Sequence, residues 1–361
     1  MITNISIEKL NSLFLISGLI NSTLDISEIR KRAIESALKL LKAEAGSIIF
    51  VDQDTGELYF DTAIGDKGED VKRIRFKKGQ GIAGWVVINK KPQIINDVQS
   101  DKRFYKGADD KSGFKTKNMI CVPLMTKYKI LGVFQVINKI EGDFFVEDME
   151  MLIALSNQVA IAVENAQLYD ELRETFYSTI HTLADTIEKR DLTTAGHTKR
   201  VTKYSVAIGK QMNLSSKELI NLKLSALLHD IGKIALSDEI LNKQKNFNYH
   251  EKNIVKMHPI YGAEILSHIN NLKDIVPSVK YHHERHNGTG YPEGLQGDEI
   301  PLFARIIAVA DSFDLLSCNR EFTKLEALKQ IQNKIWIEYD GEVVNAFVRA
   351  FKIMQKSEEE I

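Results

Sequence analysis

The sequence predicts an α+β domain in the N-terminal half, an all-α domain in the C-terminal half, and a long helix that joins them. The chain has 361 residues, which is long enough for two domains with separate cores. In the first half, some stretches have apolar residues at the spacing of a strand and others at the spacing of a helix. In the second half, the apolar spacing is that of helices. All nine histidines lie between His181 and His286. The polar chemistry is therefore expected in the all-α half.

Composition narrows the class of protein. Lys plus Arg number 48 and Asp plus Glu 49, for a formal net charge of −1, so bulk charge favours neither a nucleic acid polymer nor a membrane as partner. Cys121 and Cys318 lie far apart in mostly apolar surroundings and are expected to be reduced thiols. The first residues lack a signal-peptide pattern, and no apolar run approaches the length of a membrane span. These features predict a cytoplasmic protein.

Changes in the spacing of apolar residues predict the helices and strands of the N-terminal half. Helices are expected near residues 10–20 and 25–42, where Asp25 or Ser27 would cap the second helix. Strands are expected at 47–51, 57–61, 93–96, 119–124 and 130–137, with a short Gly-rich helix at 78–87. The long helix runs over about 147–186 and joins a domain at 1–168 to a domain at 175–355.

An apolar series on the long helix has nearly heptad spacing. Its intervals are 4, 3, 4, 3 and 7, through Leu155, Val159, Ala162, Ala166, Tyr169 and Phe176. Such a series predicts a parallel homodimer that passes a signal from sensor to effector. The alternative is a helix that packs on its own N-terminal domain. The absence of a Pro/Gly-rich linker favours rigid coupling.

Residues 5–168 resemble a GAF domain. The resemblance depends on Gly79-Gln-Gly-Ile-Ala-Gly84, the strands "ICVPL" and "LGVFQVINK", and the helix "LIALSNQVAIAVENAQLY". It implies an antiparallel sheet with helices on one face and a small-molecule pocket on the other, for a ligand that the sequence does not identify. Asn138-Lys139, Phe144 and Asp148 are similar to the N-K-F-D pattern of cyclic-nucleotide-binding members. The alternative is a structural role at a strand end and a helix start.

The second half concentrates residues that bind metals. His229 and Asp230 follow the apolar run Ala226-Leu-Leu228, and burying such groups without a partner costs several kcal/mol. Imidazole nitrogen and carboxylate oxygen are ligands of Fe, Mn and Zn. The seven candidates are His197, His229, Asp230, His258, His282, His283 and Asp311. One zinc ion uses about four ligands, so seven favour two metals, about 3.5–4 Å apart, with Asp230 as the bridging carboxylate.

Residues 175–350 resemble the HD-GYP family of metal-dependent phosphohydrolases. His229-Asp230 and Lys233 match "HDIGK", His282-His283-Glu284 matches "HHE", and Gly290-Tyr291-Pro292 matches the GYP signature. The resemblance implies hydrolysis of cyclic di-GMP to pGpG and/or GMP at a site of two divalent metals, Fe or Mn, held by the seven candidates. Members with a third metal have Glu four residues before the histidine that matches His197, where this chain has Thr193. A diguanylate cyclase (GGDEF) is an expected partner through the GYP loop.

The resemblance and the chemistry together give roles to the remaining site residues. Asp230 would hold the attacking hydroxide through the metals, and Lys233 would stabilise the phosphate, unless it only interacts with a helix C-terminus. Tyr291 would stack on a guanine or hold the loop. Arg320 is expected to contact phosphate or base, and Asp314 to lie on the substrate side. His286-Asn287 replaces the family's usual Trp-Asp, and the Asp314–Thr323 segment departs from "DALTSDRPYR".

These observations leave alternative functions. The first is a cyclic di-GMP phosphodiesterase regulated by its GAF domain. The second is a catalytically weak cyclic di-GMP receptor, which the altered Asp314–Thr323 segment leaves open although the complete set of metal ligands favours the first. The third is an HD phosphohydrolase for another cyclic dinucleotide. His181, His250, His268 and His286 are expected on the surface or in ordinary packing.

Overall fold

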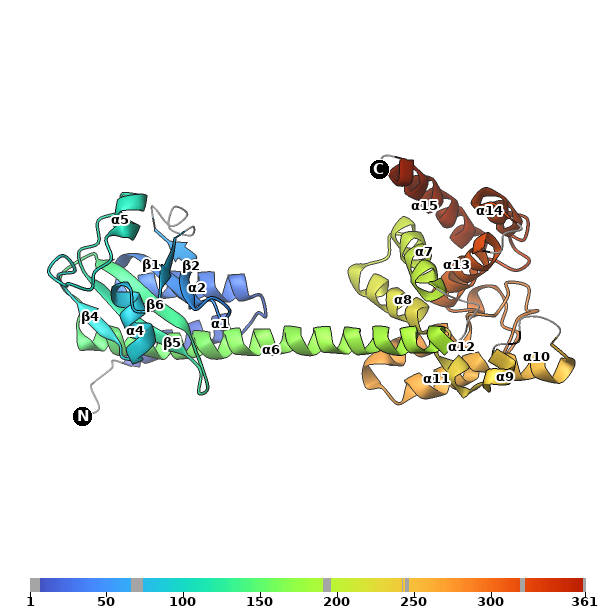
Figure 1. The fold of residues 1–361 in the computed structure, drawn as a ribbon, viewed down its shortest axis with the longest axis horizontal. Helices are drawn as coiled ribbons and strands as arrows, with labels where there is room; N and C mark the ends of the chain where they lie inside the picture. The colour runs from blue at the N-terminus through green and yellow to red at the C-terminus, as the bar shows by residue number, and fades with distance from the viewer. Residues whose placement is uncertain are drawn as a thin grey trace. The chain divides into compact units, whose positions relative to one another are not determined.

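The computed structural model describes residues 7–65, 74–190, 196–241, 243, 247–318 and 322–359. Contacts divide the chain into two units, Met1–Glu174 and Thr175–Ile361. Figure 1 shows a mixed helix-and-strand unit and a helical unit. The predicted succession of an α+β part and an all-α part is confirmed.

The N-terminal unit contains one antiparallel sheet. Its strand order is β3-β2-β1-β6-β5-β4, and every described pairing is antiparallel. The strands are β1 Ala43–Val51, β2 Glu57–Ile64, β3 Arg75–Lys77, β4 Gln93–Ile95, β5 Met119–Met125 and β6 Ile130–Lys139. The sheet confirms the architecture that the GAF resemblance implied, and β1 starts four residues earlier than expected.

Helices cover both faces of this sheet. The helices are α1 Ile7–Ile20, α2 Ile26–Leu41, α4 Gly81–Asn89, α5 Gly107–Ser112 and α6 Val146–Arg190. Side chains of β1 alternate: Ile48 packs in a core with α2 and α6, and Ile49 packs in a core with α4. The expectation of helices on one face alone is therefore corrected. The Asp25 side chain caps α2 by accepting from the backbone N–H groups of Ser27 and Glu28.

A cavity lies on the α4 side of the sheet. It encloses about 820 Å³ of space, partly open to solvent, and its lining is mostly aliphatic and aromatic, with Phe60, Phe76 and Tyr105 among its residues. Gln135 Nε2 donates to Ser47 Oγ at 2.9 Å in the lining. This position agrees with the small-molecule pocket implied by the GAF resemblance.

The residues of the N-K-F-D pattern make structural contacts within the N-terminal unit. The Lys139 ammonium forms an ion pair with Asp148 Oδ2, which also accepts from the backbone N–H of Phe145. Asn138 Oδ1 accepts from the backbone N–H of Lys117 at 2.7 Å, and its amide donates to Glu44. None of these four pattern residues lines the described cavity. The contacts favour the structural alternative over nucleotide binding.

Most residues of the apolar series on α6 pack against other residues of the same chain. Leu155, Val159, Ala162 and Ala166 are buried in the core of the N-terminal unit. Phe176 packs against a core of the C-terminal unit, and only Tyr169 is exposed. The series is therefore not a free dimer seam, and the alternative of packing on the helix's own domain accounts for most of it.

The regular elements of the C-terminal unit are all helices in the part of it that the structure describes. Its elements after α6 are α7 His197–Gln211, α8 Ser216–Leu228, η1 Ile231–Ala235, α9 Asp238–Leu241, α10 Tyr249–Val255, α11 His258–Ser267, η2 Asn270–Ile275, α12 Val276–Lys280, η3 Gly297–Glu299, α13 Leu302–Cys318, α14 Lys324–Gln332 and α15 Gly341–Glu359. Ser215 and Glu218 form the predicted capping box of α8. No helix in the described ranges is long and apolar enough to cross a membrane.

Two apolar cores hold this unit together. One joins α7, α8, α13, α14 and α15. The other joins the end of α6 to α8, η1, α11, η2 and α12. His197, His229 and His258 lie at the ends of helices that pack in these cores, and this packing fixes the positions of the three histidines.

Candidate metal centre

The His229-Asp230 pair lies where one helix stops and another begins. The helix α8 ends at Leu228, and the 3-10 helix η1 starts at Ile231. Gly232 lies against the start of α11, so close that an added Cβ would meet the His258 carbonyl oxygen at 1.9 Å. Only glycine permits this approach, which brings His258 to the same site as His229 and Asp230.

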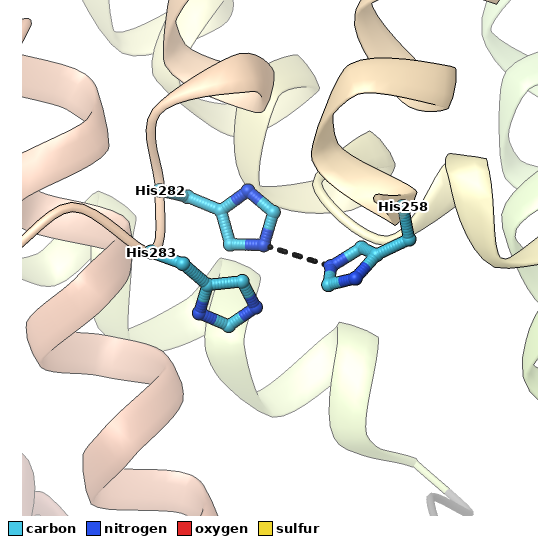
Figure 2. Close-up of side chains that lie close together, drawn as sticks. All are labelled: His258, His282 and His283. Carbon is cyan, nitrogen blue, oxygen red and sulfur yellow. Dashed lines mark hydrogen bonds between the residues drawn. The ribbon is translucent and has the colours of Figure 1, made fainter. Parts of the chain in front are cut away.

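The structure brings all seven candidates together in two separate groups of three and a third group, His229, Asp230 and His282, which shares one histidine with each of the others. The first group is His197, His229 and Asp311, and the second is His258, His282 and His283. Within each group the nearest ligand-type atoms all lie within 4.8 Å of one another. Figure 2 shows the second group, with His258 at the start of α11 and the adjacent His282 and His283 after α12.

Asp230 lies between the two groups. Its Oδ1 is 3.2 Å from His258 Nε2, and its Oδ2 is 3.3 Å from His229 Nε2. The same Oδ2 lies 3.9 Å from His197 Nε2. One carboxylate with an oxygen toward each group has the placement of a carboxylate that bridges two cations.

Hydrogen bonds orient four of the histidines. Their Nδ1 atoms face acceptors outside the centre: Ala226 O for His229 at 2.8 Å, Val255 O for His258 at 2.7 Å, Val279 O for His282 at 2.6 Å, and Asp314 Oδ2 for His197 at 2.8 Å. A carbonyl can only accept, so Nδ1 carries the proton in the first three. In the neutral rings of these three, Nε2 is left with a lone pair toward the centre, which is how protein metal sites orient imidazole ligands.

The donor set fits divalent cations. His258 Nε2 and His282 Nε2 are 3.4 Å apart, and with both Nδ1 atoms protonated two lone pairs face each other. A shared proton is disfavoured, because burial and the nearby His283 hold the pKa of His282 well below its usual value. His229 Nε2 is buried and has no hydrogen-bond partner. A metal ion would satisfy all three nitrogens.

Asp314 contacts a candidate metal ligand. It is 1% exposed, and its Oδ2 contacts His197 Nδ1 while Arg200 Nε donates to its Oδ1 at 2.7 Å. Burial raises the pKa of Asp314, but His197 and Arg200 outweigh burial and lower it. Asp314 therefore orients a candidate ligand, and its assignment to substrate binding stays a prediction. Arg200 was missed, although it lies one turn after His197 on α7.

Lys233 and Tyr291 both contact candidate ligands. Lys233 Nζ lies 2.8 Å from Asp230 Oδ2. The Tyr291 ring packs on the His283 ring with centroids 4.8 Å apart, and Lys256 Nζ lies 5.4 Å from the Tyr291 ring centroid. Of the two roles expected for Tyr291, the structure favours holding the loop beside His283.

Other expectations have mixed outcomes. Thr193 and Arg320 fall outside the described residues. His286 packs on the Trp336 ring at 5.0 Å between centroids and belongs to neither group. Asn287 accepts from the backbone and side chain of Thr289 and so closes a turn in the GYP loop.

Metal binding is expected to release a proton from His197. Burial disfavours its charged form, but Asp311 and Asp314 outweigh burial and raise its pKa to about 10. His197 is therefore protonated at pH 7 without metal and must lose that proton to become a ligand. Affinity for Mn²⁺ should rise with pH, by up to about tenfold per unit below the His197 pKa. Calorimetric titration at pH 7 and pH 8 measures this, and equal affinities would contradict it.

Comparison with known proteins agrees with the division of the chain. A family model described as GAF domain matches residues 23–164, and one described as HD domain matches residues 181–343. The chain is 34% identical over 190 residues to a "3'3'-cGAMP-specific phosphodiesterase 2" of Vibrio cholerae, covering 52% of this chain and 36% of that protein. It is 39% identical over 169 residues to a cyclic di-GMP phosphodiesterase response regulator of Xanthomonas campestris pv. campestris, covering 46% of this chain and 45% of that protein.

A third relative extends the comparison. The chain is 35% identical over 192 residues to a cyclic di-GMP phosphodiesterase of Thermotoga maritima, covering 52% of each. The chain thus spans between 36% and 52% of the length of these curated relatives. The two family matches coincide with the mixed unit and the helical unit. The N-terminal unit is thus similar to GAF domains, and the C-terminal unit is similar to HD domains.

Proposed function

We propose that the chain is a metal-dependent phosphodiesterase that hydrolyses cyclic di-GMP to pGpG and/or GMP under the control of its GAF domain. One observation carries the proposal: Asp230 places an oxygen toward each of two histidine-containing groups. The named activities of the curated relatives, on cyclic di-GMP and on 3'3'-cGAMP, support a cyclic dinucleotide as substrate.

The residues present give each part of the site a task. Two divalent cations, Fe or Mn, would be held by the seven candidates and would supply activated water and positive charge at the phosphodiester. Asp230 links the two groups, because one of its oxygens lies beside a histidine of each. Lys233, whose ammonium lies beside Asp230, would stabilise the charge that builds on the phosphate oxygens during attack. Asp314 holds the His197 ring in place.

Replacing Lys233 with alanine should lower kcat by about 10²-fold while metal content stays the same, because Lys233 contributes charge and is not a metal ligand. Lys273→Ala is the matched control, since Lys273 is exposed on η2 in the same unit. Steady-state kinetics with metal analysis of both variants test this. A Lys233→Ala enzyme with control-level kcat would remove Lys233 from the chemistry.

Substrate choice is tested by direct competition. Protein loaded with Fe or Mn under anaerobic conditions is incubated with cyclic di-GMP and with 3'3'-cGAMP, and products are separated by chromatography. The proposal expects linear dinucleotide or GMP from cyclic di-GMP. Hydrolysis of 3'3'-cGAMP alone would replace the substrate but keep the reaction class. Full metal and tight binding without product would identify a receptor and overturn the enzymatic proposal.

We also propose a parallel homodimer, now through other residues of α6. Leu168 and Leu172 are 57% and 69% exposed and lie one turn apart, beside the exposed Tyr169. Glutamate at both leucines should convert a species of about twice 40.9 kDa into one of 40.9 kDa in light scattering. Glu174→Gln is the control, and an unchanged mass would contradict this interface. The contact of the GYP loop with a diguanylate cyclase stays a prediction.

A further inference from the structure

The start of α7 is capped by a side chain from another helix. His197 is the first residue of α7, and the preceding Gly196, with φ +74°, has no side chain to act as a cap. The Glu188 carboxylate of α6 takes this role: its Oε1 accepts from the backbone N–H of Gly196, and its Oε2 accepts from the backbone N–H of Thr198 at 3.3 Å. The backbone on either side of His197 is therefore attached to α6.

Arg190, one half-turn further along α6, holds a second segment of the centre. Its Nη1 donates to Ile234 O at 3.1 Å, and its Nη2 donates to Leu236 O at 3.3 Å and to Asp238 Oδ1 at 2.7 Å. These acceptors flank the end of η1, the element that follows Asp230 and contains Lys233. A guanidinium with three separate acceptors fixes this backbone more firmly than a single contact could.

A small cavity lies beside the same part of α6 and the candidate centre. Its lining includes Ala184, Ile187 and Glu188 of α6 on one side and His197, Asp230 and Lys233 on the other, around about 320 Å³ of space. Ala184 and Ile187 of this turn also pack in an apolar core with Leu227 and Ile231, so the polar attachments through Glu188 and Arg190 add to that packing. Displacement of the turn would act on the centre through this packing and through Glu188 and Arg190.

We infer that Glu188 and Arg190 are positioning residues, through which the last turn of α6 sets the places of His197 and of the Asp230–Lys233 segment. The inference deepens the proposed function and depends on it for the meaning of these groups in catalysis. Because α6 is one continuous helix that also contributes Leu155 and Val159 to the core of the GAF domain, a change in that core has a covalent route to both attachments.

The first test measures metal affinity, which does not require turnover. Glu188→Gln keeps the shape but retains one acceptor oxygen for two N–H groups. It should weaken Mn²⁺ binding to the metal-free protein about tenfold, as loss of supporting hydrogen bonds does at other metal sites. Glu174→Gln makes the same charge change on an exposed face of α6 and should leave affinity unchanged. Thermal melting of both variants verifies folding. Equal Mn²⁺ affinities of the two variants would overturn the role of Glu188.

The second test uses Arg190→Ala against Lys189→Ala, its exposed neighbour. Arg190→Ala should lower kcat about tenfold with KM unchanged and should also weaken Mn²⁺ binding, and Arg190→Lys should restore part of both. Control-level values of Mn²⁺ affinity and kcat would overturn the role of Arg190. If the wild type binds metal but hydrolyses no cyclic dinucleotide, the proposed function fails, while the affinity comparisons still decide the positioning inference.

Discussion

Replacing Asp230 with alanine is expected to lower the rate of cyclic di-GMP hydrolysis by about 10³-fold or more. Its two oxygens lie 3.2 Å and 3.3 Å from nitrogens of different histidine groups, so no other single side chain among those described can take its place between them. Losing a bridge should remove several kcal/mol of transition-state stabilisation, and about 4 kcal/mol corresponds to 10³ in rate. Single-turnover kinetics with excess enzyme measures the chemical step directly.

Metal analysis of the same variant shows whether a lower rate comes with the loss of a metal ion or with both metals still bound. Asp230→Ala should bind about one metal equivalent where the wild type binds about two, because one group of ligands loses its shared oxygen. Asp274→Ala, an exposed carboxylate on η2, is the matched control and should keep both metals and full activity. An Asp230→Ala protein that kept turnover within about tenfold of the wild type would show that Asp230 is not the bridge.

Metal removal is expected to abolish activity and to destabilise the HD domain alone. Without cations, the Nε2 atoms of His258 and His282 face each other at 3.4 Å, and the buried His229 Nε2 makes no hydrogen bond and lies 3.3 Å from Asp230 Oδ2. A ligand at about 100 times its Kd contributes about 2.7 kcal/mol, which corresponds to a Tm shift of roughly 5–10 °C for a domain of this size. Scanning calorimetry with chelator, and again after adding Mn²⁺, measures the shift.

The GAF domain is an internal control for that experiment. Its apolar core lies in the other unit and contains none of the seven candidate ligands, so its transition should not move. Restoration of both activity and the HD-domain transition by Mn²⁺ would separate metal loss from irreversible unfolding. A chelated protein with full activity, or with an unchanged HD-domain transition, would contradict a structural role for metal in this domain.

The sequence predicted the secondary structure well where one period dominates. The apolar, β-branched run at 47–51 predicted β1, although the run alone does not say that Ile48 and Ile49 face different cores. The apolar series on α6 was ambiguous, because packing on the helix's own sheet and packing on a second copy require the same spacing. Only the surrounding structure shows that Leu155 and Val159 already lie in a core.

The sequence predicted which residues form the candidate site more completely than it predicted what each of them does there. Adjacent polar pairs such as His229-Asp230 indicate metal binding because few other partners satisfy them. The role of Asp314 depends on which way α13 faces, and its spacing from Asp311 does not determine whether it contacts substrate or His197. The attachment of Glu188 to the start of α7 also had no local signal, because Gly196 offers no side-chain cap and the partner lies on another helix.

The central claim is a pair of metal ions bridged by Asp230, and electron paramagnetic resonance of the Mn²⁺-loaded protein tests it most directly. Two Mn²⁺ ions about 3.5–4 Å apart with a shared carboxylate should give an exchange-coupled spectrum at about two equivalents of bound metal. Asp230→Ala should convert it to the spectrum of an isolated ion at about one equivalent. An isolated-ion spectrum from the fully loaded wild type would contradict the binuclear centre.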